Sequence, residues 1–190
     1  MIIGICGKSG SGKSTLSKIL TEQYENIIHL DIDKVGHNVL TIEEVKNELI
    51  KNYGNSILKN ENIDRKKLGE IIFNSRIEMN HLSDITWKYM QIEIDKFLID
   101  NKDKIIILDW ILLSISKYFD ICDIKILLDI PYEIRKERAI KRDNITKYSF
   151  DLREKASINY DPYKFDYIIK DNDIDLKRLV KKYDKSFISR

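Results

Sequence analysis

The segment GKSGSGKS, residues 7–14, constrains the fold of this chain more than any other stretch. It holds three of the seven glycines and ends in Lys13 and Ser14. A β-branched apolar run precedes it, and a helical pattern over residues 14–24 follows it. In this strand–loop–helix order, backbone N–H groups and the helix N-terminus surround a phosphate. The segment therefore predicts a site for a nucleoside triphosphate.

The segment also matches the P-loop signature GxxxxGK[ST]. In such a loop the lysine reaches the β- and γ-phosphates, and the hydroxyl binds Mg²⁺. We therefore expect a nucleoside triphosphate and Mg²⁺ at this site, with Ser14 as a metal ligand. The predicted nucleotide-binding residues are Gly7, Lys8, Ser9, Gly10, Ser11, Gly12, Lys13, Ser14 and Thr15.

Other motifs in the sequence indicate which class of triphosphate-using protein this chain resembles. A small GTPase needs a guanine-reading NKxD motif, which the sequence lacks, and the DKVG segment at 33–36 comes too early to be its DxxG switch. Mechanical ATPases are usually larger and carry sensor elements that we do not find. A small-molecule kinase remains, and it needs an acceptor pocket, a base and a cationic lid.

Five short apolar runs predict the strands of the fold. They are nearly continuous rather than alternating, which is typical of parallel strands covered on both faces. The pattern predicts an α/β fold of three layers. The runs are residues 2–6, 27–31, 105–109, 124–129 and 166–170.

The remaining segments suggest one domain, residues 1–190, with two additions. Residues 41–104 show helical spacing of apolar residues and predict an all-helical insertion, in which Ile92 is expected on an apolar face. Residues 131–160 predict a lid, and a last amphipathic helix is expected over 176–187.

The charge composition gives no sign of a nucleic-acid or membrane partner. The 33 basic and 31 acidic side chains give a net charge of +2 with both signs interspersed, so nothing calls for nucleic acid or a membrane surface.

Cys6 and Cys122 have no metal-ligand spacing, and we expect Cys6 to be a buried, unreactive thiol. No secretory leader or membrane span is evident. We expect a cytoplasmic monomer or weak oligomer that acts on a small molecule.

Three of the predicted strands end in aspartate, at the edge where open α/β sheets bind ligands. Asp31 and Asp33 alternate, and on an extended chain both would leave the strand end near the γ-phosphate. The alternative is a solvated loop or a helix cap. Asp109 is placed like the metal-binding acid of P-loop enzymes, although an ordinary strand-end aspartate is an equal interpretation.

Arginines suggest the lid. On a helix that starts after Pro131, Arg135, Arg138 and Arg142 share one face and could clamp phosphoryl oxygens. A solvated face with ion pairs is the alternative. The three histidines share no ligand spacing, and His29 lies in a strand pattern typical of a packed side chain.

Several segments, taken in order, resemble the dephospho-coenzyme A kinase family. They are IIGICGKSGSGKST, LDIDKVGHNVL, IDRKKLGEIIFN, RAIKRDNIT and FDYIIKDND. The resemblance implies transfer of the γ-phosphate of ATP to the 3′-hydroxyl of dephospho-CoA, the last step of coenzyme A synthesis. It also implies a five-stranded parallel sheet of the P-loop kinase type, with a helical CoA-binding subdomain and a lid.

The same resemblance implies roles for residues of this chain. Asp33 would be the catalytic base, and Arg142 and Arg138 would act from the lid beside Lys13. Further implied positions are Asp31, His37 and Arg65 on the substrate side, Asp109 at the metal, and Asp171 and Asn172 near the adenine.

Some family features are missing. Trp87 and Lys88 stand where the family has a His-Pro pair, and Ile111 replaces the proline of a D-x-P-L-L-x-E segment whose acid is also absent. These losses leave two alternatives open. One is a nucleoside or nucleotide kinase with the same core, and the other is a non-catalytic ATP-binding regulator.

Overall fold

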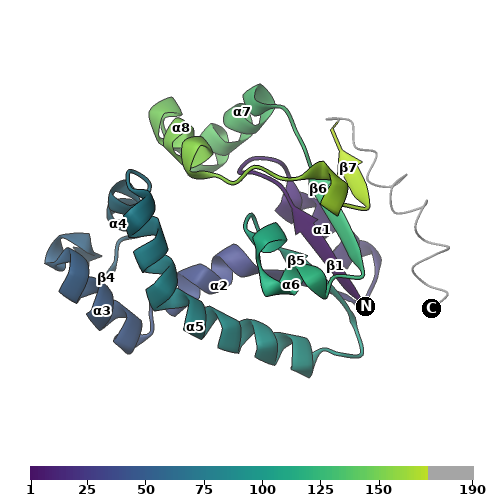
Figure 1. Ribbon diagram of the computed structural model, residues 1–190, viewed down its shortest axis with the longest axis horizontal. Coiled ribbons are helices and arrows are strands. Elements are labelled where there is room, and N and C mark those ends of the chain that lie inside the picture. Colours follow the sequence, from purple (N-terminus) through teal and green to yellow (C-terminus); the bar gives the residue numbers. More distant parts are fainter. Residues whose placement is uncertain (171–190) are drawn as a thin grey trace. The chain divides into compact units, whose positions relative to one another are not determined.

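Figure 1 shows the computed structural model, which describes residues 1–170. The chain divides into two compact units. The first comprises Met1–Asp31, Lys102–Phe150 and residues 157–170, and the second comprises Ile32–Asn101 with Asp151–Ala156. Among the described residues, no helix is long and apolar enough to cross a lipid bilayer.

The first unit is built on a five-stranded parallel sheet, as the sequence predicts. Its strand order is β2-β5-β1-β6-β7, so the chain crosses over between neighbouring strands. Figure 1 labels β5, β1, β6 and β7 of this sheet. Continuous isoleucine and leucine runs form these strands because both of their faces need apolar cover. The strands are β1 (Ile2–Cys6), β2 (Ile27–Asp31), β5 (Ile105–Asp109), β6 (Ile124–Leu128) and β7 (Tyr167–Ile169).

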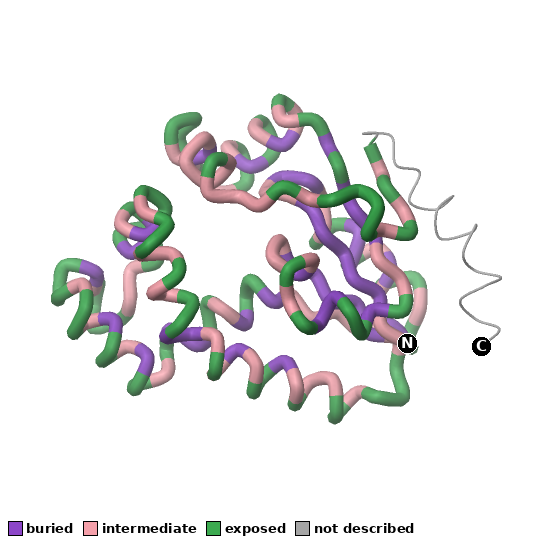
Figure 2. The backbone as a smooth tube through the Cα atoms, in the orientation of Figure 1, coloured by how far each residue is buried: buried purple, intermediate pink, exposed green. Residues whose placement is uncertain are grey.

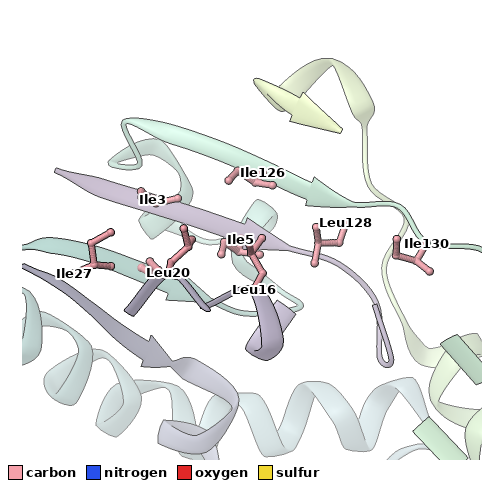
Figure 3. Close-up of a cluster of buried hydrophobic side chains, with 9 residues drawn as sticks. Ile3, Ile5, Leu16, Leu20, Ile27, Ile126, Leu128 and Ile130 are labelled. Carbon is pink, nitrogen blue, oxygen red and sulfur yellow. The ribbon is translucent and has the colours of Figure 1, made fainter. Parts of the chain in front are cut away.

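Helix α1 (Lys13–Gln23) covers one face of this sheet. Figure 3 shows Leu16 and Leu20 of α1 among the isoleucines of β1 and β2. Fully burying one such side chain stabilises the fold by roughly 1.5–3 kcal/mol. The loop before α1 is therefore held at both of its ends by the core. The cluster consists of Ile3, Ile5, Leu16, Leu20, Ile27, Ile107, Ile126, Leu128 and Ile130.

Within residues 110–170, three more helices follow β5. They are α6 (Lys117–Asp120), α7 (Tyr132–Asp143) and α8 (Lys147–Ala156). Helix α7 begins directly after Pro131, as predicted, because proline presets the dihedral angle of a helix start and lacks an N–H that would need a partner. Short 3₁₀ turns occupy Leu113–Ile115 and Pro162–Lys164.

The second unit is mostly helical and has its own core. Helix α5 (Arg76–Asp100) packs on α2 (Ile32–Val39), α3 (Glu43–Tyr53) and α4 (Arg65–Ile72). Figure 2 shows buried positions on these helices as well as on the strands of the sheet. The core of the second unit consists of Leu40, Val45, Leu49, Ile57, Leu68, Ile72 and Ile85.

Three expectations about this segment are wrong. The helical region starts at Ile32 rather than residue 41. It is not all-helical, because β3 (Leu58–Lys59) and β4 (Asn62–Ile63) pair antiparallel across a turn with positive φ at Asn60 and Glu61. Ile92 is 55% exposed, whereas Ile94 is buried, because the helix buries residues 90 and 94, one turn apart, and position 92 faces away.

Candidate active site

The loop between β1 and α1 has the features of an anion site. Gly12 directly precedes α1 and has φ 96°, and no side chain caps the first N–H groups of the helix. These N–H groups carry the positive end of the helix dipole. Ser11 is 1% exposed, and its Oγ has no hydrogen-bond partner within residues 1–170. The residues of the loop thus fit a polyphosphate, because they offer donors that an anion would satisfy.

Close packing explains the glycine at the start of the loop. A Cβ added to Gly7 would lie 2.5 Å from Ser11 Oγ and 2.9 Å from the carbonyl oxygen of Leu128. Both distances are shorter than real carbon contacts allow. The loop therefore turns tightly against the end of β6, and a side chain at position 7 would open it.

Asp109 lies beneath the start of α1 and draws two loop side chains together. Ser14 Oγ donates a hydrogen bond of 3.1 Å to Asp109 Oδ2, and Lys13 Nζ lies 3.8 Å from Oδ1. Lys13 Nζ also donates to the carbonyl of Gly7 at 2.9 Å. Asp109 is only 2% exposed, and a carboxylate so buried is normally paired. This geometry favours the metal-acid interpretation over an ordinary strand end.

The oxygen atoms around Asp109 fit a magnesium ion. Mg²⁺ prefers oxygen ligands and is usually bound by one or two carboxylates together with substrate phosphates. Asp31 is the register partner of Asp109 at the ends of β2 and β5, so two carboxylates end adjacent strands. Within residues 1–170, no three His, Cys, Asp or Glu side chains form an all-protein metal site. The arrangement suits a metal shared with a substrate.

His29 lies beside Asp109 of the candidate site, a place that sequence reasoning did not predict for it. Its Nε2 lies 3.4 Å from Asp109 Oδ2, but this is an electrostatic approach, since Nε2 has no hydrogen-bond partner in the described part of the chain. His29 sits two positions before the end of β2, beside the strand that carries Asp109. The pairing of β2 with β5 brings His29 close to Asp109. The pattern of apolar residues in the sequence does not predict which strands pair, so it could not predict this contact.

The expectation of an extended chain through Asp33 is wrong. Strand β2 ends at Asp31, and α2 begins at the next residue, so Asp33 is an exposed residue of the first helical turn. Buried Ile32, Val35 and Val39 hold α2 in the second unit. A carboxylate in a first helical turn is favoured by the helix dipole. Asp33 thus has a fixed place on a helix rather than on a strand.

The three arginines of α7 divide into two kinds. Arg135 is 5% exposed and donates from Nε to the carbonyl of Ile130 at 2.8 Å and from Nη1 to that of Ser9 at 3.4 Å. Arg138 and Arg142 are exposed. Arg138 approaches the loop, because its Nη1 lies 3.9 Å from where a Cβ of Gly12 would stand. Arg142 donates to both carboxylate oxygens of Asp143, at 2.7 and 3.1 Å.

A cavity in the second unit contains two predicted substrate residues. His37 of α2 and Arg65 of α4 both line it, and its volume is about 250 Å³. Asp64 caps α4 by accepting from the N–H groups of Lys67 and Lys66, and the Lys67 bond is the main cause that lowers the pKa of Asp64. The cap fixes the helix start that carries Arg65. The lining residues are His37, Asn38, Leu40, Thr41, Asn62, Ile63 and Arg65.

The remaining expectations concern the two cysteines and the residues after position 170. Cys6 and Cys122 are free and buried, as expected for Cys6, and burial is the main cause that raises the pKa of each thiol to about 12. Asp171, Asn172 and the predicted helix 176–187 lie outside the described residues.

Comparisons with known proteins identify the family. A family model described as dephospho-CoA kinase matches residues 1–182. A dephospho-CoA kinase of Fusobacterium nucleatum is 36% identical over 188 residues, which are 97% of this chain and 96% of that protein.

Solved structures show the same fold. A Thermus thermophilus protein superposes with a TM-score of 0.79 over 98% of this chain and 97% of its own, at 21% identity. A dephospho-CoA kinase from Campylobacter jejuni has a TM-score of 0.63 over 98% of both chains, also at 21% identity. With a match of nearly full length to the family model and to a relative above 30% identity, this chain belongs to the dephospho-CoA kinase family, whose kinases have the P-loop fold and use ATP.

Proposed function

We propose that the protein transfers the γ-phosphoryl group of Mg²⁺–ATP to the 3′-hydroxyl of dephospho-CoA. The observation that carries the proposal is the convergence of Lys13 and Ser14, at the uncapped start of α1, on the buried carboxylate of Asp109. A triphosphate bound there would meet helix N–H groups and an ammonium group. Such a site suits phosphoryl transfer, in which catalysis is mostly positioning and charge stabilisation.

In this proposal the loop binds the phosphates of ATP. The N–H groups at the start of α1 and the Ser11 hydroxyl donate to phosphate oxygens, and Lys13 shifts its donation from the carbonyl of Gly7 to the transferring group. Thr15 lies in the first turn of α1, beside these donors. The remaining contacts come from the loop backbone of residues 7–12.

Ser14 and Asp109 are the residues that would hold Mg²⁺, with Asp31 beside them. The ion supplies charge compensation between the β- and γ-phosphates when it is bound. Asp109 has a second role that needs no metal, because its carboxylate keeps Lys13 oriented at 3.8 Å.

We assign the proton of the acceptor hydroxyl to Asp33. A carboxylate that accepts this proton raises the nucleophilicity of the oxygen as it attacks phosphorus. Asp33 is exposed on α2, and it follows the strand-end carboxylate of Asp31 by two residues. The proton leaves the 3′-hydroxyl for this carboxylate, and the bridging oxygen of ADP takes the electron pair of the broken P–O bond.

Arg138 and Arg142 complete the proposal from α7. Guanidinium groups bind phosphoryl oxygens through paired donors and offset the charge that spreads over them in the transition state. Arg138 already stands beside Gly12 of the loop. Arg142 is paired with Asp143 and would exchange this partner for the phosphoryl group.

The acceptor would be held in part by the cavity of the second unit. Its volume of about 250 Å³ is near the lower end of small-ligand sites, so it suits a portion of dephospho-CoA rather than the whole molecule. Arg65 and His37 offer donors for its phosphate or amide oxygens. As part of the same proposal, the enzyme acts in the cytoplasm on small molecules, as a monomer or weak oligomer.

A direct assay tests the proposal. The protein is incubated with ATP, Mg²⁺ and dephospho-CoA, and we expect a product heavier by one phosphoryl group with the mass of CoA. Parallel incubations with nucleosides and nucleoside monophosphates should give no acceptor-dependent ADP. ADP release with a nucleoside and none with dephospho-CoA would contradict the proposed acceptor.

A further inference from the structure

Arg135 joins the phosphate-binding loop to helix α7. Its guanidinium donates to the carbonyl of Ser9 in the loop at 3.4 Å and to that of Ile130, just before the helix, at 2.8 Å. The side chain is 5% exposed. One buried group therefore bonds to two backbone segments that are far apart in sequence.

A backbone contact reinforces this connection. A Cβ added to Gly10 would stand 2.2 Å from the carbonyl oxygen of Arg135, a distance that no real contact reaches. Gly10 also has φ +80°, which favours glycine. The loop thus lies directly on the first turns of α7, and the same helix presents Arg138 to Gly12.

Burial of a guanidinium needs a physical reason. Removing a charged group from water is unfavourable, and an apolar side chain such as methionine would fill a similar space without that penalty. Arginine alone offers several N–H donors in a rigid fork that serves two acceptors at once. Because these donors bind the carbonyls of Ser9 and Ile130, we infer that the loop must be held in a fixed position against α7.

We propose that Arg135 is a positioning residue for ATP. It holds residues 9 and 10 of the loop against α7, so that the loop keeps its phosphate-binding shape and a constant place relative to Arg138. Arg135 acts through the loop backbone and does not touch the substrate. The inference rests on the proposed function of the loop.

The test compares three variants with the wild type. Arg135→Met removes both donors, Arg135→Lys keeps the charge but not the fork, and Lys141→Met removes an exposed charge from the same helix as a control. Binding of inorganic tripolyphosphate is measured by calorimetry. Steady-state kinetics give kcat and the KM for ATP and for dephospho-CoA, and thermal melting reports the fold.

We expect Arg135→Met to raise the Kd for tripolyphosphate and the KM for ATP about tenfold, while the KM for dephospho-CoA changes less than twofold. A tenfold change is about 1.4 kcal/mol, within the usual penalty for a buried acceptor left without its donor. Arg135→Lys should lie between, at about threefold. Lys141→Met should match the wild type.

Several results would overturn the inference. One is a folded Arg135→Met variant that binds tripolyphosphate with wild-type affinity. Another is a variant with a lower melting temperature or a lower kcat but unchanged KM values for both substrates, because that result indicates a merely structural role. If Arg135→Met does not fold, a folded Arg135→Lys with unchanged affinity is equally decisive. Failure of the wild type itself to bind tripolyphosphate would instead contradict the proposed function, and the role of Arg135 with it.

Discussion

Ser14 donates its hydroxyl hydrogen to the carboxylate of Asp109 across 3.1 Å, although 95 positions separate the two residues. The hydroxyl comes from the first turn of α1, and the carboxylate ends β5. Asp109 is buried and also lies 3.8 Å from Lys13. A single buried carboxylate therefore contacts both Lys13 and Ser14, the two side chains that we propose for phosphoryl transfer.

Replacement of this carboxylate should raise the Mg²⁺ requirement. Asp109→Asn keeps the shape but removes the charge, so we expect the Mg²⁺ concentration for half-maximal rate to increase about tenfold or more. The measurement is initial rate against free Mg²⁺ at fixed ATP. Asp166→Asn is the control, because Asp166 Oδ2 accepts from the N–H of Lys125 at 2.8 Å and a side-chain amide oxygen can replace it. Equal Mg²⁺ dependence in both variants would remove Asp109 from the metal site.

Loss of the proposed base should affect turnover and not nucleotide binding. We expect Asp33→Asn to lower kcat about 100-fold or more, in the range of general-base catalysis, with the Kd for ATP within twofold of wild type. Stopped-flow or coupled assays give kcat, and calorimetry gives the Kd. Asp84→Asn, on the exposed side of α5, is the matched control in the same unit. Unchanged turnover in Asp33→Asn would assign the proton to another group.

Arg142 should matter for activity and little for stability. Its ion pair with Asp143 is exposed, and such pairs contribute about 1 kcal/mol or less to the free energy of unfolding. Arg142→Met should therefore unfold at nearly the wild-type denaturant concentration but turn over about 100-fold more slowly, because a cation beside the transferring group is lost. Denaturant unfolding and kcat are measured on the same preparation. A variant that loses stability and keeps kcat would show that Arg142 only supports the fold.

The two thiols should be inert in the folded protein. Burial raises the pKa of Cys6 and Cys122 to about 12, so almost no thiolate exists at pH 8. We expect alkylation by iodoacetamide to be slow in buffer and complete in denaturant, as read by mass. Because the folded pKa is the higher one, the contribution of these thiols to stability is full below pH 9 and is lost as pH rises from about 9 to 12. Fast labelling in buffer at pH 8 would contradict their burial.

The strands of the parallel sheet show how much of the fold the local pattern of apolar residues can predict. The runs 2–6, 27–31 and 105–109 became strands with the same bounds, because a parallel strand buried on both faces needs an unbroken apolar run. The glycines of the loop could also be assigned from the sequence, because their spacing reflects the backbone shape around a phosphate. Local pattern misled at Asp33, where alternation suggested extended chain and buried Ile32, Val35 and Val39 favoured a helix.

The amino-acid sequence by itself determined the strands of the parallel sheet, the loop and the family, but not the short hairpin of β3 and β4. Only the tertiary structure decided which side chains meet: His29 and Ser14 at Asp109, and Arg135 at Ser9. The physical reason is that these contacts depend on strand register and helix docking between segments far apart in the chain. The free energy of such packing is summed over the whole core, and no local window of sequence contains it.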